Sequence, residues 1–139
     1  MKIRVASEVD YPELRQIYLE SRRKSFDWMS AKEMILEDFD THTRGEYIIL
    51  AEEDTHIMGF ASLYLPNDFI HNLFVHPDFL GKGIGSKLLN AAIEKMNKPL
   101  TLKCVSENKK AMSFYENNGW KKVVEQGGPG EKYWIMVYE

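Results

Sequence analysis

The sequence predicts a mixed α+β fold of three layers, in which helices cover both faces of a central sheet. Strand-like and helix-like segments follow one another in the order β, α, α, β, β, β, α, β, α, β, β. Residues 46–53, 57–65 and 69–75 carry apolar side chains on both faces, which is typical of central strands covered on both sides. No repeat or low-complexity linker divides the 139 residues, so we expect a single domain over residues 1–139.

Capping residues and apolar spacing predict two helices near the N-terminus. Residues 1–6 alternate like a short strand. Asp10 and Glu13 then have the spacing of a capping box, and apolar residues recur behind them at helical intervals (Leu14, Ile17, Tyr18). Ser30 and Glu33 have the same spacing, which predicts a second helix with an apolar side (Ile35, Leu36, Phe39).

The second half of the chain alternates helices with strands. After Gly85, an apolar stripe predicts an amphipathic helix (Leu88, Leu89, Ala92, Ile93, Met96). Residues 99–105 form a predicted strand and residues 108–117 a predicted helix that ends before Gly119. Two further strands, over residues 120–125 and 132–138, flank a glycine-rich turn and close the chain.

The composition limits the class of protein. A hydrophobic fraction of 44% and a charged fraction of 28% are globular values, and a net charge of −3 provides no basic field for nucleic acid or an anionic membrane surface. Cys104 is the single cysteine, which excludes an internal disulfide, and the four histidines show no metal-ligand spacing. There is neither a charged-then-apolar leader nor an apolar run of membrane-spanning length, so we expect a cytoplasmic protein.

A glycine-rich turn between a strand and a helix is the most informative segment. Gly81, Gly83 and Gly85 alternate immediately before the predicted amphipathic helix. Glycines allow a tight turn and close approach of a ligand, while the free N–H groups at the start of the helix attract anions. Lys82 and Lys87 add positive charge nearby. The pattern predicts a site for a pyrophosphate.

Two familiar phosphate loops do not match this segment. The dinucleotide fingerprint requires glycine at its sixth position, where Ser86 stands, and a P-loop requires Ser or Thr after its lysine, where Gly83 follows Lys82. A nucleotide-binding switch is therefore disfavoured. The alternative without a ligand is a plain glycine-rich connector.

Residues 73–89 resemble the acetyl-CoA-binding motif of the GNAT superfamily of N-acetyltransferases, usually written Q/R-x-x-G-x-G/A. A second signature of the family, Asn, Ala, Phe-Tyr and Gly-aromatic, is similar to the run from Asn108 to Trp120. The resemblance covers nearly the whole chain and implies a mostly antiparallel, twisted sheet flanked by helices. One position departs from the motif, because Leu80 stands where the family usually has Gln or Arg.

The resemblance also implies how acetyl-CoA would bind. Backbone groups of Leu73, Phe74 and Val75 would pair with the pantetheine arm like an added strand. The turn would hold the pyrophosphate through six consecutive residues (Gly81, Lys82, Gly83, Ile84, Gly85, Ser86). Asn108 would hold the cofactor from the next helix, and its alternative role as a plain N-cap is compatible with this.

Acyl transfer from a thioester to an amine needs a base for the amine, a donor to the carbonyl oxygen and an acid for the departing thiolate. The resemblance places the family's tyrosine acid at Tyr115, whose alternative role is core packing. His71 lies where related enzymes often carry a base, although it could equally be a surface histidine with a partner. His76 is expected to shape a turn, and Cys104 to pack in the core rather than to act as a nucleophile.

The acceptor pocket is expected near the connector between the first two helices. Phe26, Asp27 and Trp28 could receive a small-molecule or peptide amine, or could simply form a packed loop. We therefore expect an acetyl-CoA-dependent N-acetyltransferase that acts directly on a primary amine and needs no metal. The alternative is a module of the same fold that senses acyl-CoA without turnover. The aromatic last strand could also pair with a second subunit in a homodimer (Tyr133, Trp134, Tyr138).

Overall fold

The computed structural model describes residues 1–26 and 30–139 of the chain. Within these residues seven strands form one sheet: β1 (Lys2–Val5), β2 (Tyr47–Glu53), β3 (His56–Tyr64), β4 (Phe69–Val75), β5 (Leu100–Val105), β6 (Lys121–Gln126) and β7 (Tyr133–Tyr138). The α-helices among them are α1 (Tyr11–Ser25), α2 (Asp38–His42), α3 (Ile84–Lys95) and α4 (Lys109–Asn117). The predicted order of elements is confirmed, with most boundaries moved by one or two residues.

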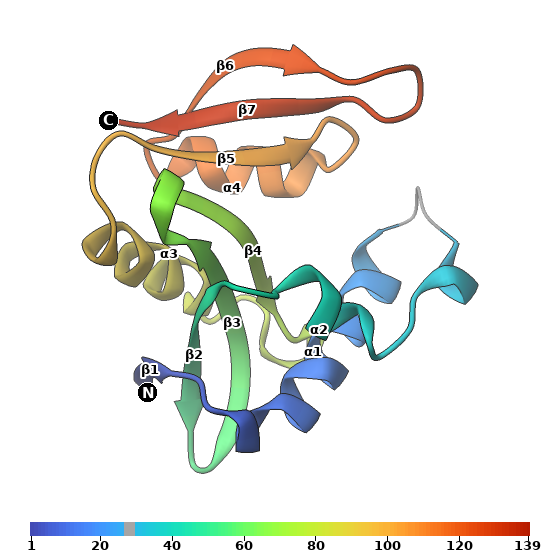
Figure 1. The fold of residues 1–139 in the computed structure, drawn as a ribbon, viewed down its shortest axis with the longest axis vertical. Coiled ribbons are helices and arrows are strands. Elements are labelled where there is room, and N and C mark those ends of the chain that lie inside the picture. The colour runs from blue at the N-terminus through green and yellow to red at the C-terminus, as the bar shows by residue number, and fades with distance from the viewer. Residues whose placement is uncertain (27–29) are drawn as a thin grey trace.

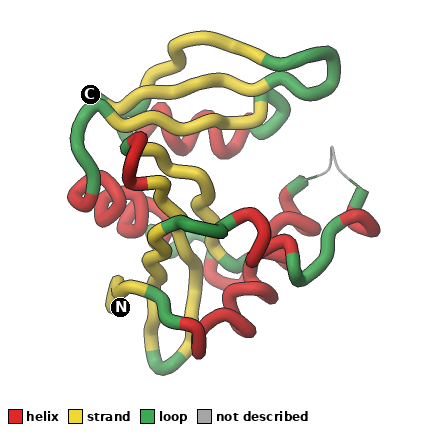
Figure 2. Tube along the Cα trace, viewed as in Figure 1, coloured by secondary structure: helices red, strands yellow, loops and turns green. Residues whose placement is uncertain are grey.

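The sheet has the strand order β1-β2-β3-β4-β5-β7-β6. Neighbouring strands are antiparallel except β4 and β5, which pair in parallel. Helices lie on both faces of this sheet, so the mixed α+β class and the mostly antiparallel sheet are confirmed (Figures 1 and 2). Among the described residues, none of the helices combines the length and the apolar character that a bilayer crossing requires.

Two hydrophobic clusters fill the space between the layers. One lies between the sheet and α3 and α4, where Leu88 and Leu89 of α3 are fully buried. The other packs α1 and α2 against β2 and β3, around Phe39 and Phe60. Residues 57–63 of β3 are buried without interruption. The expectation that the central strands are covered on both sides is therefore confirmed for β2 and β3, whereas β4 is buried only at Ile70 and Asn72.

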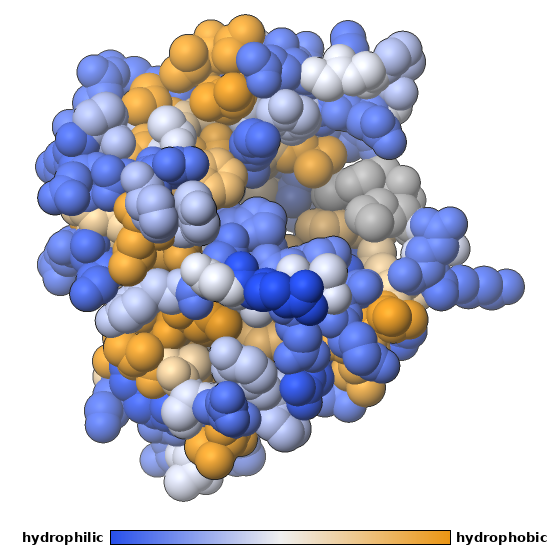
Figure 3. All heavy atoms as spheres, in the orientation of Figure 1, coloured by the Kyte–Doolittle hydropathy of each residue, from blue (hydrophilic) through white to orange (hydrophobic). Residues whose placement is uncertain are grey.

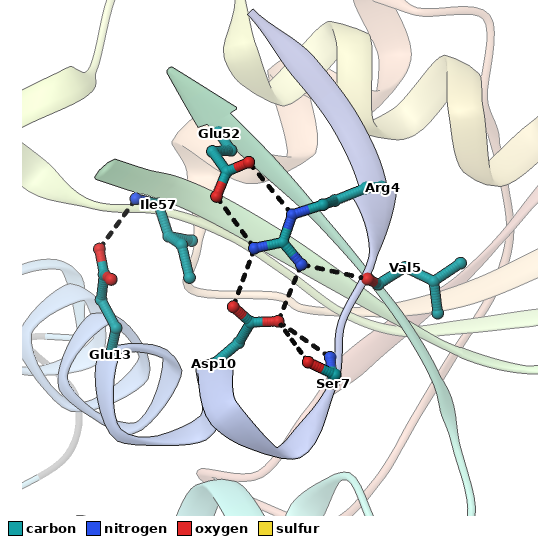
Figure 4. Close-up of polar contacts among 7 residues, drawn as sticks. All are labelled: Arg4, Val5, Ser7, Asp10, Glu13, Glu52 and Ile57. Atoms are coloured by element: carbon teal, nitrogen blue, oxygen red, sulfur yellow. Dashed lines mark hydrogen bonds and ion pairs between the residues drawn. The ribbon is translucent and has the colours of Figure 1, made fainter. Parts of the chain in front are cut away.

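The start of α1 differs from the predicted capping box. A 3-10 turn (Glu8–Asp10) precedes the helix, and the Asp10 carboxylate accepts a hydrogen bond from the Ser7 backbone N–H at 2.9 Å. Glu13 instead accepts the backbone N–H of Ile57 at the start of β3, at 2.8 Å (Figure 4). The sequence has the expected spacing, but the Glu13 carboxylate binds the start of β3, which is distant in sequence, and does not cap α1.

Arg4 joins β1, β2 and the start of α1 in the same region. Its guanidinium donates to both oxygens of Asp10, at 2.8 and 2.9 Å, and to both oxygens of Glu52, at 2.9 and 3.1 Å (Figure 4). The guanidinium lowers the pKa of the largely buried Asp10 carboxyl far below its ordinary value. This bidentate pairing holds the edge strand against the helix.

The second predicted helix is mostly wrong. Only a 3-10 turn (Ala31–Glu33) forms after Ser30, and α2 begins later, at Asp38. The Asp38 carboxylate accepts the Ile35 backbone N–H at 3.0 Å and pairs with Arg22 at 3.2 Å. These contacts favour a turn before α2, and Ile35 is left exposed.

The aromatic last strand does not have a free edge. β7 lies between β5 and β6 and pairs with both, and the side chains of Trp134 and Tyr138 pack against the cluster under α4. Backbone pairing of a second subunit with this end of the sheet would therefore involve β6, not the expected β7.

Candidate active site

A cleft opens where β4 and β5 separate. The two strands pair only at Phe69 with Thr101 and Ile70 with Leu102, although both strands continue for several residues. Beyond these pairs the strands diverge, and one face of the molecule is hollowed between them (Figure 3). The cleft has a volume of about 880 Å³ and is lined by the ends of β4 and α1, the glycine turn and the first residues of α3 and α4.

The end of β4 presents unpaired backbone to this cleft. Leu73, Phe74 and Val75 line it and pair with β3 on one side only. Backbone N–H and C=O groups on the other side therefore lack a neighbouring strand within the cleft. Ser21 of α1 donates to the Val75 carbonyl at 3.3 Å and so fixes the end of the strand against the helix.

The three glycines of the turn are needed for different reasons. Gly81 and Gly83 have φ angles of 80° and 76°, the left-handed region that side chains disfavour. Gly85 has an ordinary helical conformation, but an added Cβ would lie 3.3 Å from the Phe114 ring of α4. Gly81 and Gly83 shape the turn, and Gly85 lets α3 approach α4.

The first turn of α3 is an open helix end. Gly83 is its N-cap and no side chain caps the helix. The backbone N–H groups of Ile84, Gly85 and Ser86 belong to the first turn of the helix and therefore have no acceptor within it. All three residues line the cleft. Because the helix dipole adds positive potential there, this end of the cleft suits a phosphate group.

The two lysines expected from the sequence, Lys82 and Lys87, are not among the residues that line the cleft. The Lys82 ammonium lies 5.6 Å from the centre of the Phe79 ring. Three other lysines line it instead (Lys24, Lys109, Lys110). Lys109 and Lys110 follow Asn108 directly at the start of α4, and that position was a usable signal in the sequence. Leu80 also lines the cleft and is 58% exposed.

Asn108 caps α4, as predicted. Its side-chain oxygen accepts the Ala111 backbone N–H at 3.2 Å, and the residue also lines the cleft. Because the oxygen is engaged in capping, the side-chain NH₂ group is the part of Asn108 that can contact a ligand.

Tyr115 of α4 is one of the residues that line the cleft. Its ring packs edge-on against Phe114 and Trp120, with ring centres 5.3 and 6.1 Å away. Burial raises the pKa of the Tyr115 hydroxyl well above its ordinary value. The hydroxyl therefore remains protonated at neutral pH and can donate a hydrogen bond.

Cys104 lies on β5, where its side chain is buried and its thiol is free. Burial raises the pKa of its thiol to about 11, so the thiol is not ionised at neutral pH. This is the packing role expected for it.

The histidines occupy different surroundings. His71 does not line the cleft; its Nδ1 lies 2.7 Å from a carboxylate oxygen of Glu46. His76 accepts the Asp78 backbone N–H at 3.1 Å and contacts Glu20 of α1, which agrees with a role in shaping the turn. Across residues 1–26 and 30–139, no group of His, Cys, Asp and Glu side chains is arranged to hold a metal ion.

The expected acceptor residues are only partly visible. Phe26 lines the cleft, and its ring lies 5.8 Å from that of Phe74. Asp27 and Trp28 lie outside the described residues.

Comparisons with known proteins agree with this geometry. The acetyltransferase (GNAT) family matches residues 11–120. An uncharacterized N-acetyltransferase, YhfO of Bacillus subtilis (strain 168), is 32% identical over 137 residues, which cover 88% of this chain and 91% of the relative. An uncharacterized N-acetyltransferase of Archaeoglobus fulgidus is 28% identical over 148 residues, covering 95% of this chain and all of the relative.

Solved structures share the fold. PaiA N-acetyltransferase of Thermoplasma acidophilum, solved in complex with coenzyme A, superposes with a TM-score of 0.82 at 21% identity, covering 100% of this chain and 99% of that one. YncA of Salmonella typhimurium, a putative acetyltransferase solved with acetyl-CoA, has a TM-score of 0.75 at 18% identity, covering 100% and 93%. These matches confirm the resemblance drawn from the glycine turn and the Asn108–Trp120 signature, and the chain belongs to the GNAT family of acetyltransferases.

Proposed function

We propose that this acyltransferase binds acetyl-CoA in the cleft between β4 and β5 and transfers the acetyl group directly to a primary amine. The observation that carries the proposal is the meeting of three features in one cleft. This cleft is lined by an unpaired strand edge at Leu73–Val75, by an open helix end at Gly83 and by Tyr115.

The cofactor would extend along the cleft from its phosphates to its thioester. The N–H groups at residues 81–86 and the Asn108 NH₂ group of α4 would donate to the pyrophosphate, and Lys109 and Lys110, which line the cleft, would add positive charge. The pantetheine arm would pair with the free edge of Leu73, Phe74 and Val75, as an added strand does. A β4 backbone N–H would then donate to the thioester carbonyl oxygen.

Catalysis would require proton transfers at the amine and at the departing sulfur. An acceptor ammonium gives one proton to a base, for which His71 is the candidate, and its nitrogen then attacks the carbonyl carbon. The C–N bond forms and the C–S bond breaks, while Tyr115 donates its proton to the departing thiolate. The proton that leaves the new amide nitrogen restores the Tyr115 hydroxyl. The products are the acetylated amine, coenzyme A and the one proton held by the base.

Phe26 would form part of the acceptor side, because it packs against Phe74 at the mouth of the cleft. An apolar wall beside the reacting nitrogen suits an amine with an alkyl or aryl group, whether a small molecule or a peptide.

A panel of amines with acetyl-CoA, monitored by release of free thiol, tests the proposal. We expect thiol release that depends on an amine and mass spectrometry that shows an acetylated product. Tight binding of acetyl-CoA with no turnover across small amines, amino acids and peptides would instead indicate an acyl-CoA sensor. Failure of acetyl-CoA to bind at all would refute the assignment of the cleft.

A further inference from the structure

A second polar cluster lies on β4, where the strand carries a β-bulge two residues before Leu73, which lines the cleft. Leu63 of β3 pairs with Ile70, but its neighbour Ser62 pairs with Asn72, so His71 is the extra residue. A bulge locally bends a strand and redirects a side chain. Here it presents His71 to Glu46, which immediately precedes β2, 25 positions earlier in the chain.

Glu46 is a buried carboxylate in which only one of the two oxygens has a partner. Its side chain is 9% exposed, and one oxygen lies 2.7 Å from Nδ1 of His71. Its other oxygen, Oε1, is buried and has no hydrogen-bond partner among the described residues. An ionised carboxylate in such a position is unfavourable unless it is paired. An ionised Glu46 carboxylate therefore depends on His71 for a partner, and the buried Oε1 atom without a hydrogen bond is an unusual feature of this part of the fold.

The His71 ring is held but accessible. Its side chain is 42% exposed, so solvent or a substrate can reach the ring. With Nδ1 facing the carboxylate, Nε2 is the nitrogen that remains to take a proton. In the neutral ring this arrangement selects the tautomer with hydrogen on Nδ1 and a lone pair on Nε2.

We propose that Glu46 is the positioning residue for the acceptor side of the active site: it fixes the orientation and tautomer of His71, so that Nε2 accepts the proton of the amine. This rests on the proposed function. The proton passes from the acceptor ammonium to Nε2, the imidazolium that forms is stabilised by the Glu46 carboxylate, and the freed lone pair on nitrogen forms the C–N bond.

The groups around His71 decide how it titrates. The Glu46 carboxylate raises the pKa of His71, with a smaller contribution in the same direction from a backbone group of His42 at the end of α2. Burial and the Lys103 ammonium on β5 lower the pKa of His71, but the net direction is upward. A raised pKa means that the free base appears only as the pH rises through it. Activity should therefore increase along an acid limb set by His71 and Glu46.

A second histidine close by provides an internal comparison. Nδ1 of His42 lies 2.6 Å from the Tyr18 hydroxyl, and burial lowers the pKa of His42. Burial also raises the pKa of Tyr18 to about 12, so the phenol remains protonated and donates to the His42 ring. The two imidazoles should thus titrate in opposite directions from the ordinary histidine value.

The kinetic experiment measures kcat/KM against pH for the wild type, Glu46→Gln and Glu46→Ala. Glutamine retains an oxygen that can accept from Nδ1 but has no charge, so we expect its acid limb at lower pH with a largely retained plateau. Alanine loses both orientation and charge, and we expect a plateau roughly 10- to 100-fold lower. Glu53→Gln is the matched control, because Glu53 lies at the opposite end of β2 from Glu46, is 57% exposed and pairs with the N-terminus.

An acid limb that stays in place in Glu46→Gln would overturn the proposal, as would a limb that moves only in His42→Gln. Neither result would affect the proposed function, which fails only if the wild type acetylates no amine. Coenzyme A affinity serves as the check on folding for each variant, since Glu46 does not line the cofactor cleft.

A titration of the histidine rings by NMR tests the same inference without turnover. His71→Gln and His42→Gln assign the two signals in the coenzyme A complex. We expect His71 to titrate at higher pH than His42 in the wild type, and to move to lower pH in Glu46→Gln. The reverse order, or a His71 signal that does not respond to Glu46→Gln, would refute the role given to Glu46.

Discussion

Gly83→Val is the most direct test of the glycine turn. Gly83 is the N-cap of α3 with φ at 76°, and an added Cβ would have no heavy atom within 4 Å. The substitution therefore produces backbone strain without a clash. Because Gly83 lines the cleft, the branched side chain would lie next to the N–H groups proposed to hold the pyrophosphate.

The size of the effect follows from these contacts. A β-branched residue in the left-handed region costs roughly 1–2 kcal/mol, which corresponds to a fall in Tm of about 3–7 °C for a chain of this size. Losing two charge-assisted hydrogen bonds of about 1.5 kcal/mol each removes about 3 kcal/mol of binding. That loss corresponds to a Kd for coenzyme A about 100-fold higher.

Titration calorimetry with coenzyme A gives the affinity, and circular dichroism gives the Tm. Gly130→Val is the matched control, since Gly130 has φ at 79° and open space around its Cβ but lies between β6 and β7. We expect a similar fall in Tm with unchanged affinity. A folded Gly83→Val protein that binds coenzyme A like the wild type would show that the turn is only a connector.

Three further predictions concern the cleft and the N-terminal ion pair. Tyr115→Phe should lower kcat roughly 10- to 1,000-fold with little change in coenzyme A affinity, because only the hydroxyl meets the thiolate; wild-type kcat with chemistry limiting would remove Tyr115 from the mechanism. Leu80→Arg should tighten coenzyme A binding several-fold, by about 1 kcal/mol, through a charge-assisted contact whose effect shrinks as salt rises. Because Leu80 is exposed, we expect an unchanged Tm, and weaker coenzyme A binding would contradict the proposed pose. The lowered pKa of Asp10 stabilises the fold above the ordinary carboxyl value and less as the pH falls, so the Tm difference between the wild type and Asp10→Asn should shrink below about pH 4. A difference that is constant with pH would show that Arg4 does not act on Asp10 through its charge.

The local features of this protein were predictable from the sequence because they depend on neighbours in the chain. Gly81 and Gly83 adopt left-handed backbone conformations that few other residues adopt, and Asn108 caps α4 through a side-chain oxygen three residues away from the N–H that it accepts. The order of elements was also predictable, because the spacing of apolar residues distinguishes a helix from a strand and indicates which face is buried. The GNAT assignment rested on these same local motifs.

Long-range contacts decided the rest. Glu13 does not cap α1 as expected, because its carboxylate accepts the Ile57 backbone N–H. The Asp38 carboxylate accepts the Ile35 backbone N–H and stabilises a turn where the Ser30 spacing predicted a helix. The cleft exists because β4 and β5 stop pairing after two residue pairs, a property of the twisted sheet and of no local pattern. Glu46 and His71 meet only because a bulge on one strand faces the start of another. The sequence by itself determined which elements form and where the phosphate-binding turn lies, whereas the tertiary structure alone decided which ionisable side chains share a site, because their separations depend on how the strands are placed in the sheet.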